Sequence, residues 1–183
     1  LKEDKTTVHK LRSEHKVTTI AQMSEKPWTM ALERCSELAT DFCPDLLICG
    51  TSVPDFSIPA NASTIAEQLQ LQCAAFDVNS ACSSFVTGLA TARAMLATTG
   101  HYQAAAVFNV ERYTLSMDFK DRKSCVLFGD GAACSILLKT RSHHVKGLEL
   151  VDVVLHSDPS GSMQVVIPTD GYFYQNGSAV QKF

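Results

Sequence analysis

The sequence predicts an α/β protein in which helices cover a mainly parallel central sheet. Short apolar runs typical of buried strands alternate with segments whose apolar residues recur at helical spacing. One helical segment, residues 82–99, contains a single charged residue, Arg93, which is the pattern of a helix covered nearly all round. With 183 residues, of which 45% are hydrophobic, the chain is long enough to bury the core that such layers need.

The first elements form a strand–helix–strand unit behind a polar N-terminal stretch. Apolar residues at helical spacing predict a helix over residues 28–42. The continuous apolar run 46–50 predicts a strand buried on both faces, as in parallel sheets. Asn61 offers a cap for the helix that follows, residues 63–71, and residues 73–78 predict a second buried strand.

The later elements continue this alternation. The apolar helix 82–99 is expected to end at Gly100, and residues 104–110 predict another strand. Residues 125–138 are expected to form two strands around a Gly-Asp-Gly turn, and residues 148–155 one strand more. No repeat, low-complexity tract or linker divides these segments.

Charge and cysteine content exclude several classes of protein. The 16 Lys and Arg residues against 19 Asp and Glu residues give a net charge of -3 without long charged runs, so we expect no nucleic-acid partner. No apolar run reaches the roughly 18 to 20 residues of a membrane span, and the first residues are charged, so we expect a soluble protein without a membrane partner. Seven cysteines without a CxxC pair or a nearby His predict a reducing cytoplasm and no metal site.

The junction FDVNSACSSF, residues 76–85, places a cysteine where a predicted strand turns directly into the apolar helix. A thiol at a helix N-terminus lies near unpaired N–H groups and the positive end of the helix dipole, which favour the nucleophilic thiolate. Small residues on both sides of Cys82 leave room for a substrate carbonyl. Cys82 is therefore a candidate nucleophile, with a buried structural thiol as the alternative, because no base can be identified beside it.

The histidines do not supply that base. Five lie in polar stretches or beside a helix end and are expected to be solvated: His9, His15, His101, His143 and His144. His156, in LHSD, has the only setting typical of a site, although a structural role is the favoured interpretation. The sequence FGDG, which begins at Phe128, lacks the spacing of a phosphate-binding loop and is interpreted as a tight turn.

Four motifs, taken in order, resemble those of β-ketoacyl-acyl-carrier-protein synthase III. They are FDVNSACSSF (76–85), MDFKDRKSCVLFGDGAACSILL (117–138), LHSD (155–158) and GYFYQNGSAVQKF (171–183). The resemblance implies a thiolase-like fold, with two similar α/β halves in α/β/α/β/α layers, of which this chain supplies mainly the first half. Residues 1–44 are then a polar segment and first helix, and residues 45–183 are the first half plus the start of the second.

The resemblance also assigns the catalytic thiol. Cys82 matches the nucleophile that accepts the acyl group, and its backbone N–H matches one arm of the oxyanion hole. In the family, a His and an Asn from the second half orient the thioester and stabilise the carbanion, in motifs resembling HQAN and GNTS. Neither motif occurs in this sequence, and none of its histidines matches that His.

Three further positions match substrate-binding residues of the family. Arg122 matches an Arg that packs on the adenine of coenzyme A, with a surface ion pair to Asp118 or Asp121 as the alternative. Phe128 matches an aromatic residue of the substrate tunnel. Ile58 matches a side chain, often Phe, that crosses a dimer interface to close the acyl pocket of the partner subunit; the smaller Ile implies a pocket that admits chains larger than acetyl.

The implied function is that of an acyltransferase and condensing enzyme in fatty acid or polyketide-type biosynthesis. An acyl group would pass from a coenzyme A or acyl-carrier-protein thioester to the cysteine, and a decarboxylating malonyl thioester would then attack it. The implied partners are acyl-coenzyme A, acyl carrier protein, and either a second copy or a chain carrying the second half. No bound cofactor is implied. The alternatives are a non-catalytic scaffold subunit of a split synthase and an acyltransferase of the same fold that acts on oxygen or nitrogen.

Overall fold

The computed structural model describes residues 18–35, 38, 41–117, 119–122, 125–140, 147–162 and 164–167, and the backbone of residues 172–175 and 178–181. The helices are α2 (Ile20–Arg34), α3 (Asn61–Gln68) and α4 (Ser84–Thr98), with single 3-10 turns η1 (Tyr113–Leu115) and η2 (Pro159–Gly161). The strands are β1 (Leu46–Gly50), β2 (Ala74–Val78), β3 (Ala104–Arg112), β4 (Asp130–Leu138), β5 (Tyr172–Gln175) and β6 (Ser178–Gln181).

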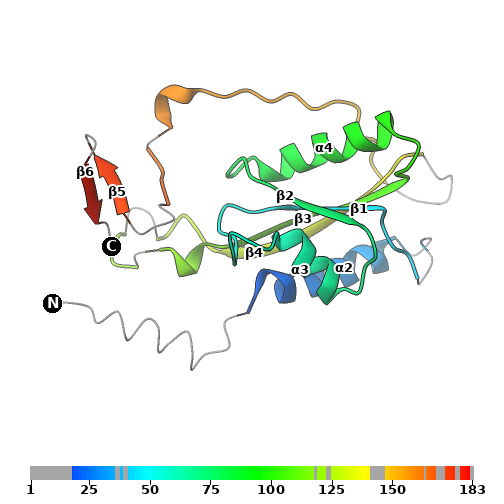
Figure 1. Ribbon diagram of the computed structural model, residues 1–183, viewed down its shortest axis with the longest axis horizontal. Helices are drawn as coiled ribbons and strands as arrows, with labels where there is room; N and C mark the ends of the chain where they lie inside the picture. The colour runs from blue at the N-terminus through cyan, green and yellow to red at the C-terminus, as the bar shows by residue number, and fades with distance from the viewer. Residues whose placement is uncertain are drawn as a thin grey trace.

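A four-stranded sheet in the order β2-β1-β3-β4 forms the centre of the protein (Figure 1). β1 is parallel to both of its neighbours, whereas β4 runs antiparallel to β3. α4 covers one face of the sheet, and α2 and α3 cover the other (Figure 1). The predicted α/β layering around a mainly parallel sheet is therefore confirmed.

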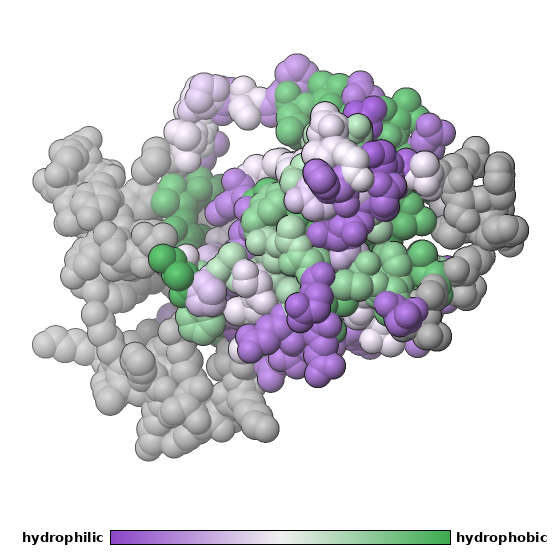
Figure 2. Space-filling model, turned by 45° about the vertical axis from the view of Figure 1, so that its right-hand side comes forward, coloured by the Kyte–Doolittle hydropathy of each residue, from purple (hydrophilic) through white to green (hydrophobic). Residues whose placement is uncertain are grey.

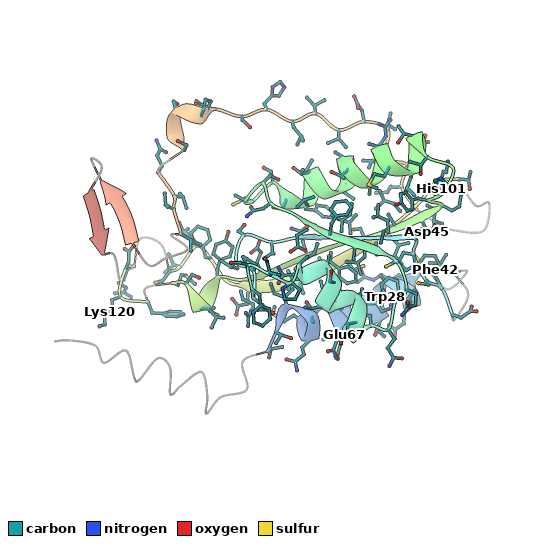
Figure 3. The ribbon with its side chains drawn as sticks, in the orientation of Figure 1. Trp28, Phe42, Asp45, Glu67, His101 and Lys120 are labelled. Atoms are coloured by element: carbon teal, nitrogen blue, oxygen red, sulfur yellow. The ribbon has the colours of Figure 1, made fainter. Side chains whose placement is uncertain are left out.

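The alternation of side chains along β1 and β3 divides the core into two clusters. One cluster joins the sheet to α2 and α3 and includes Leu47, Cys49, Phe108 and Trp28. Trp28 lies against Phe42 and Phe108, with ring centroids 6.2 and 6.1 Å apart (Figure 3). The other cluster joins the opposite face of the sheet to α4 and includes Leu46, Ile48, Val107, Ala92 and Leu96.

α4 packs unusually close to the sheet because it presents Gly88 to β3. A Cβ atom at Gly88 would lie 2.9 Å from Cγ1 of Val107. The outer side of α4 remains partly exposed in the described part of the chain, with Phe85 and Val86 at 37% and 40% exposure. The prediction of a helix covered nearly all round is therefore wrong for this chain, because only one sheet face packs on it.

The first helix lies earlier than predicted. The expected range was 28–42, whereas α2 spans Ile20–Arg34 and includes Pro27. A capping box starts the helix: the Thr19 hydroxyl accepts from the Gln22 N–H, and the Gln22 side chain accepts from the Thr19 N–H. Pro27 lacks the N–H of one helical hydrogen bond, and burial of Ile20 and Trp28 on either side offsets that loss.

The strand–helix–strand unit forms as expected, with two differences. β2 is an edge strand whose side chains are half-buried or exposed, so the prediction of full burial was wrong. Asn61 is the first residue of α3 and does not cap it. The carboxylate of Asp77, on β2, accepts hydrogen bonds from the N–H groups of Asn61 and Ala62 at 2.8 and 2.7 Å, so a neighbouring strand caps the helix.

Two strand predictions in the later part of the chain were wrong. Residues 125–138 contain one strand and not two. This strand, β4, begins at Asp130 of the Gly-Asp-Gly sequence and ends at Leu138. Residues 148–155 are extended but pair with no strand in the described part of the chain. This segment runs above α4, where the Arg93 guanidinium donates to the carbonyls of Leu150 and Val151 (Figure 1). A strand requires a neighbouring strand, and α4 offers none.

The segment above α4 leaves apolar side chains at the surface. Val151 is 71% exposed and Val154 is 69% exposed. Figure 2 shows hydrophobic patches interspersed with hydrophilic ones along the upper edge of the molecule. None of the helices in the described ranges combines the length and apolar character needed to cross a bilayer.

Candidate active site

The parallel register brings the ends of three strands to one edge of the sheet. Gly50 pairs with Val78 on one side and with Asn109 on the other, so β1, β2 and β3 end side by side. β4 begins at the same edge, because Asp130 pairs with Arg112. The loops that follow these strands therefore meet there. In open α/β sheets this carboxyl edge is where ligands bind.

Cys82 lies at this edge, on a tight turn between β2 and α4. Ala81, just before it, has a φ of 49°, a left-handed conformation that is costly for a residue with a Cβ. The turn is braced from inside: the Ser84 hydroxyl accepts from the Ser80 N–H at 3.0 Å and donates to the Ala81 carbonyl at 2.7 Å. The side-chain oxygen of Asn79 accepts a further hydrogen bond from the Ala81 N–H at 3.0 Å. Cys82 is held in a defined position ahead of α4.

The thiol of Cys82 is exposed, which does not fit the alternative of a buried structural thiol. Its position is close to the positive end of the α4 dipole, and the N-cap residue Ser83 makes no side-chain bond to the first turn. Burial raises the pKa of two other thiols, that of Cys73 to about 11 and that of Cys134 to about 12. The structure thus singles out Cys82 as an accessible thiol at the carboxyl edge.

A carboxylate lies beneath the loop that follows β1. Glu111, near the end of β3, accepts hydrogen bonds from the Ser52 N–H at 2.9 Å and from the Ser52 hydroxyl at 3.1 Å. The Thr51 hydroxyl also donates to it, at 3.4 Å. Burial raises the pKa of Glu111, and these hydrogen bonds partly oppose that increase by stabilising the charged form. Glu111 therefore fixes the start of the loop.

Tyr113 directly follows β3, at the same edge of the sheet. Burial is the largest cause of the raised pKa of Tyr113, and the negative charges of Glu111 and Cys82 also raise it. The Tyr113 ring also packs against Phe128, with centroids 5.0 Å apart. Phe128, a predicted substrate-binding residue, is thus part of the same edge as Cys82.

A buried ion pair anchors the rest of the loop after β1. Arg112 pairs with Asp55, and their side chains are only 11% and 6% exposed. Arg112 also donates to the Thr18 carbonyl at 2.6 Å, and Asp55 accepts from the Ile20 N–H at 2.8 Å, so the loop is attached to the start of α2. Ile58 lies in this anchored loop and is 88% exposed.

The remaining predicted residues are placed as follows. Arg122 is exposed, and Asp118, one of its alternative ion-pair partners, lies outside the described residues. His101 precedes β3 and lies at the opposite end of the sheet from Lys120 and the site edge, which excludes it as a base for Cys82 (Figure 3). His156 is exposed on the segment above α4, and the other four histidines lie outside the described residues.

Sequence reasoning missed Thr51, Ser52, Glu111 and Tyr113. The sequence contains a signal for these residues, because polar residues directly follow the apolar run of β1 and end that of β3. Adjacent parallel strands end at the same edge of a sheet, so these polar residues come together only when β1 and β3 are known to be neighbours. In the described part of the chain, no group of three or more His, Cys, Asp or Glu side chains is arranged to hold a metal ion.

Comparison with known proteins identifies the segment that contains this edge. Residues 76–159 match the model of the 3-oxoacyl-[acyl-carrier-protein] synthase III family. This segment is similar to the synthase III family. It begins within β2, includes the Cys82 turn, α4, β3 and β4, and reaches the start of η2.

Solved structures of synthase III enzymes share the same fold. The enzyme of Aquifex aeolicus VF5 is 34% identical over 55% of this chain, with a TM-score of 0.51, and the matched part is 32% of that enzyme. The enzyme of Pseudomonas aeruginosa PAO1 is 28% identical over 68% of this chain, with a TM-score of 0.61, and 38% of its own length is matched. The priming β-ketosynthase of the R1128 polyketide pathway is 30% identical over 64% of this chain, with a TM-score of 0.57 and 35% of its length matched.

The chain therefore spans about a third of the length of these synthase III structures. Over residues 76–159, which include Cys82, the chain is similar to synthase III, a family of condensing enzymes.

Proposed function

We propose that this chain carries the acyl-accepting site of a synthase III-type condensing enzyme, with Cys82 as the nucleophile. The observation that carries the proposal is the placement of Cys82: an exposed thiol, on a braced turn before α4, at the carboxyl edge of a synthase III-like sheet. That arrangement gives a thioester carbonyl access to the sulfur from outside the sheet.

The chemistry follows from a thiolate at this position. The Cys82 thiolate attacks the carbonyl of an acyl-coenzyme A or acyl-carrier-protein thioester, and the released thiolate takes up the proton that Cys82 lost. A malonyl thioester then loses carbon dioxide, and the resulting carbanion attacks the acyl carbon and releases the Cys82 thiolate. Forming a covalent acyl-enzyme divides a difficult carbon–carbon bond formation into two easier steps.

The predicted substrate-binding residues each have a role in this proposal. Arg122 would stack on the adenine of coenzyme A, since a guanidinium packs well on flat rings. Phe128 would line the acyl channel, and its contact with Tyr113, which follows β3 at the site edge, supports this role. Coenzyme A enters only as part of the thioester substrate, and no resident cofactor is proposed.

The carbanion step requires groups that this sequence does not match, so we propose that further residues of the same polypeptide or a second subunit supply the His and the Asn. The exposed outer side of α4 and the apolar segment above it support this, because apolar surface of that kind is normally covered. The free edge of β2 and the exposed Ile58 support a dimer contact beside the site.

Intact mass measurement after incubation with an acyl-coenzyme A tests the proposed nucleophile. We expect one acyl adduct, and a peptide digest should locate it on Cys82. Cys82→Ala should abolish the adduct, whereas Cys43→Ala, which removes another exposed thiol, should leave it unchanged. An adduct that survives Cys82→Ala would contradict the proposal, and its complete absence in the wild-type protein would favour a scaffold subunit.

A second measurement separates condensation from simple acyl transfer. The acylated protein is supplied with malonyl-acyl-carrier protein, or with amine and alcohol acceptors, and the products are identified by mass. Loss of carbon dioxide and a lengthened β-ketoacyl product indicate condensation. Transfer to oxygen or nitrogen instead would assign the chain to the other acyltransferases of this fold.

A further inference from the structure

The loop that follows β1 is closed at its base by one side chain. The side-chain oxygen of Asn61 accepts a hydrogen bond from the Asp55 N–H at 3.1 Å, so residues 55–61 form a closed loop. Asn61 is only 1% exposed, whereas Phe56 and Ile58, nearer the middle of the loop, are 56% and 88% exposed. The loop therefore has a buried base and an apolar tip at the surface.

The other end of the same amide fastens the loop to β2. Nδ2 of Asn61 donates to Oδ2 of Asp77 at 3.0 Å, and the Asn61 N–H donates to the same oxygen at 2.8 Å. Asp77 belongs to the strand that leads into the Cys82 turn. A carboxylate only accepts hydrogen bonds and a backbone N–H only donates them, so a side chain that joins Asp77 to the Asp55 N–H must offer both a donor and an acceptor. An uncharged amide meets this requirement.

The two residues that bond to the Asn61 side chain, Asp55 and Asp77, are both acidic. The Asp55 carboxylate pairs with Arg112 of β3 and accepts from the first N–H of α2 at 2.8 Å. The Asp77 carboxylate accepts from the N–H groups that begin α3, and neither α2 nor α3 has an acidic residue in its first turn. Cys49 of β1 pairs with Asp77 in the sheet, and burial raises the pKa of its thiol, which is therefore uncharged. Asn61 thus joins two acidic residues without adding a third charge.

We propose that Asn61 is a positioning residue of the acyl-accepting site: by closing loop 55–61 onto β2, it holds Ile58 in one place and so limits the length of the acyl chain that reaches Cys82. The inference rests on the proposed function, because it takes Cys82 as the acyl acceptor and Ile58 as a side chain that closes an acyl pocket. A pocket discriminates between chains by contacts with each added methylene, and those contacts require side chains that are held in place. A loop with an open base would let Ile58 move aside and admit longer acyl groups.

Hydrogen exchange measured by mass spectrometry tests the bridge without any substrate. In the full-length protein, exchange of the peptide that contains the Asp55 N–H is followed from pH 8 to pH 5. Each rate is divided by the intrinsic rate at that pH, and the amides of β1 serve as the reference for global unfolding. Asn61→Ala removes both the donor and the acceptor, so we expect about tenfold less protection of the Asp55 N–H at every pH.

Gln68→Ala is the matched control for this measurement. It removes another side-chain amide of α3, one that donates to Oε1 of Glu25 at 2.6 Å, and it leaves the base of the loop intact. We expect the protection of the Asp55 N–H to be unchanged in this variant.

Asn61→Asp gives a result that a simple loss of packing would not give. The new carboxyl group keeps the acceptor for the Asp55 N–H but replaces the donor to Asp77 with a second carboxylate oxygen. The two carboxylates repel each other at pH 8, so protection should be lost there. At lower pH they share one proton, because a like charge raises the pKa of a carboxyl group, and the shared proton restores the donor. We expect protection to return toward the wild-type value as pH falls to 5.

Competition between octanoyl-coenzyme A and acetyl-coenzyme A measures the effect on chain length. Both substrates react with the same Cys82 thiolate, so the ratio of the two adducts does not depend on the ionisation of the thiol. We expect Asn61→Ala to raise the octanoyl-to-acetyl ratio about threefold. Asn61→Asp should raise the ratio at pH 8 and return it to the wild-type value at pH 5.

Several results would overturn the proposal. They are unchanged protection in Asn61→Ala, protection in Asn61→Asp that does not return at pH 5, an equal loss of protection in Gln68→Ala, and an adduct ratio that keeps its wild-type value while protection is lost. Failure of the proposed function has a different signature: the wild-type protein forms no acyl adduct. That result would refute the role of Asn61 in chain selection, while the exchange rates would still establish or refute the bridge itself.

Discussion

Small side chains with specific hydrogen bonds position the residues around Cys82. Ser84 braces the turn from within, and Gly50 allows it to approach β3: a Cβ atom at Gly50 would lie 2.8 Å from Oδ1 of Asn109 and 2.9 Å from Cβ of Ser84. Substituting Gly50 would therefore push on the residue that holds the Cys82 turn. The same edge contains Glu111, whose charge is buried at a cost that its hydrogen bonds offset only in part.

At the residue level, the raised pKa of Glu111 makes a contribution to stability that depends on pH. Because the folded protein holds this proton more tightly than the unfolded chain, the contribution is present below the ordinary pKa of Glu and is lost as pH rises through the raised value. We expect the stability of the wild-type protein relative to Glu111→Gln to decrease across that window. Urea unfolding at a series of pH values checks this, and a difference that increases with pH would contradict it.

Ile58 supports a second prediction at the residue level, about acyl chain length. An Ile closes less of an acyl pocket than a Phe, so we expect acyl groups longer than acetyl to be accepted and Ile58→Phe to shift the preference toward shorter chains. Each methylene is worth about 1 to 3 kcal/mol of discrimination. Competing acyl-coenzyme A substrates, compared by adduct mass, measure the preference. Strict acetyl preference in the wild-type protein would contradict the prediction.

Among the elements, α3 depends on a strand for its cap. Asp77 of β2 accepts hydrogen bonds from two N–H groups at the start of α3. Ala60, the residue directly before the helix, contributes no side-chain hydrogen bond. The helix has only eight residues, so it cannot be stable without such tertiary contacts. β2 therefore positions both α3 and the Cys82 turn, although it is an edge strand.

We predict that Asp77→Asn destabilises the protein by about 1 to 2 kcal/mol, because it removes a charged acceptor from a helix N-terminus. Chemical denaturation monitored by circular dichroism measures the loss. Glu67→Gln, near the other end of α3 and exposed, is the control and should change the free energy of unfolding by less than about 0.5 kcal/mol. Equal effects of the two substitutions would show that the cap contributes nothing.

The whole molecule presents two kinds of open surface. On one side, α4 and the segment above it expose apolar side chains that include Phe85, Val86, Val151 and Val154. On the other, β2 is the edge strand of the sheet that the structure describes, and the loop after β1 exposes Ile58. Surfaces of both kinds favour association.

We expect residues 1–183, expressed by themselves, to associate in solution and to lack condensation activity. The apolar surface over α4 would be uncovered, and the groups that stabilise the carbanion would be missing. Light scattering gives the solution mass, and an assay with acyl and malonyl thioesters gives the activity. A monomer that condenses these substrates would show that the missing groups are not required.

The sequence by itself determined the alternation of strands and helices, the positions of β1 and β3, and the placement of a cysteine between β2 and α4. These features depend on neighbouring residues: continuous apolar runs, helical spacing, and small residues at a sharp turn. The resemblance to synthase III also followed from short sequence motifs, and the family comparison confirmed it over residues 76–159.

Only the tertiary structure decided how distant polar residues combine at the site. Ser52 and Glu111 are 59 positions apart and meet because β1 and β3 are adjacent and parallel. Asp77 replaces Asn61 as the cap of α3 for a similar reason, since strand order places a carboxylate under the helix. Residues 148–155 have the pattern of a strand but remain unpaired, because strand formation depends on a neighbour's hydrogen-bonding groups and not on the segment alone.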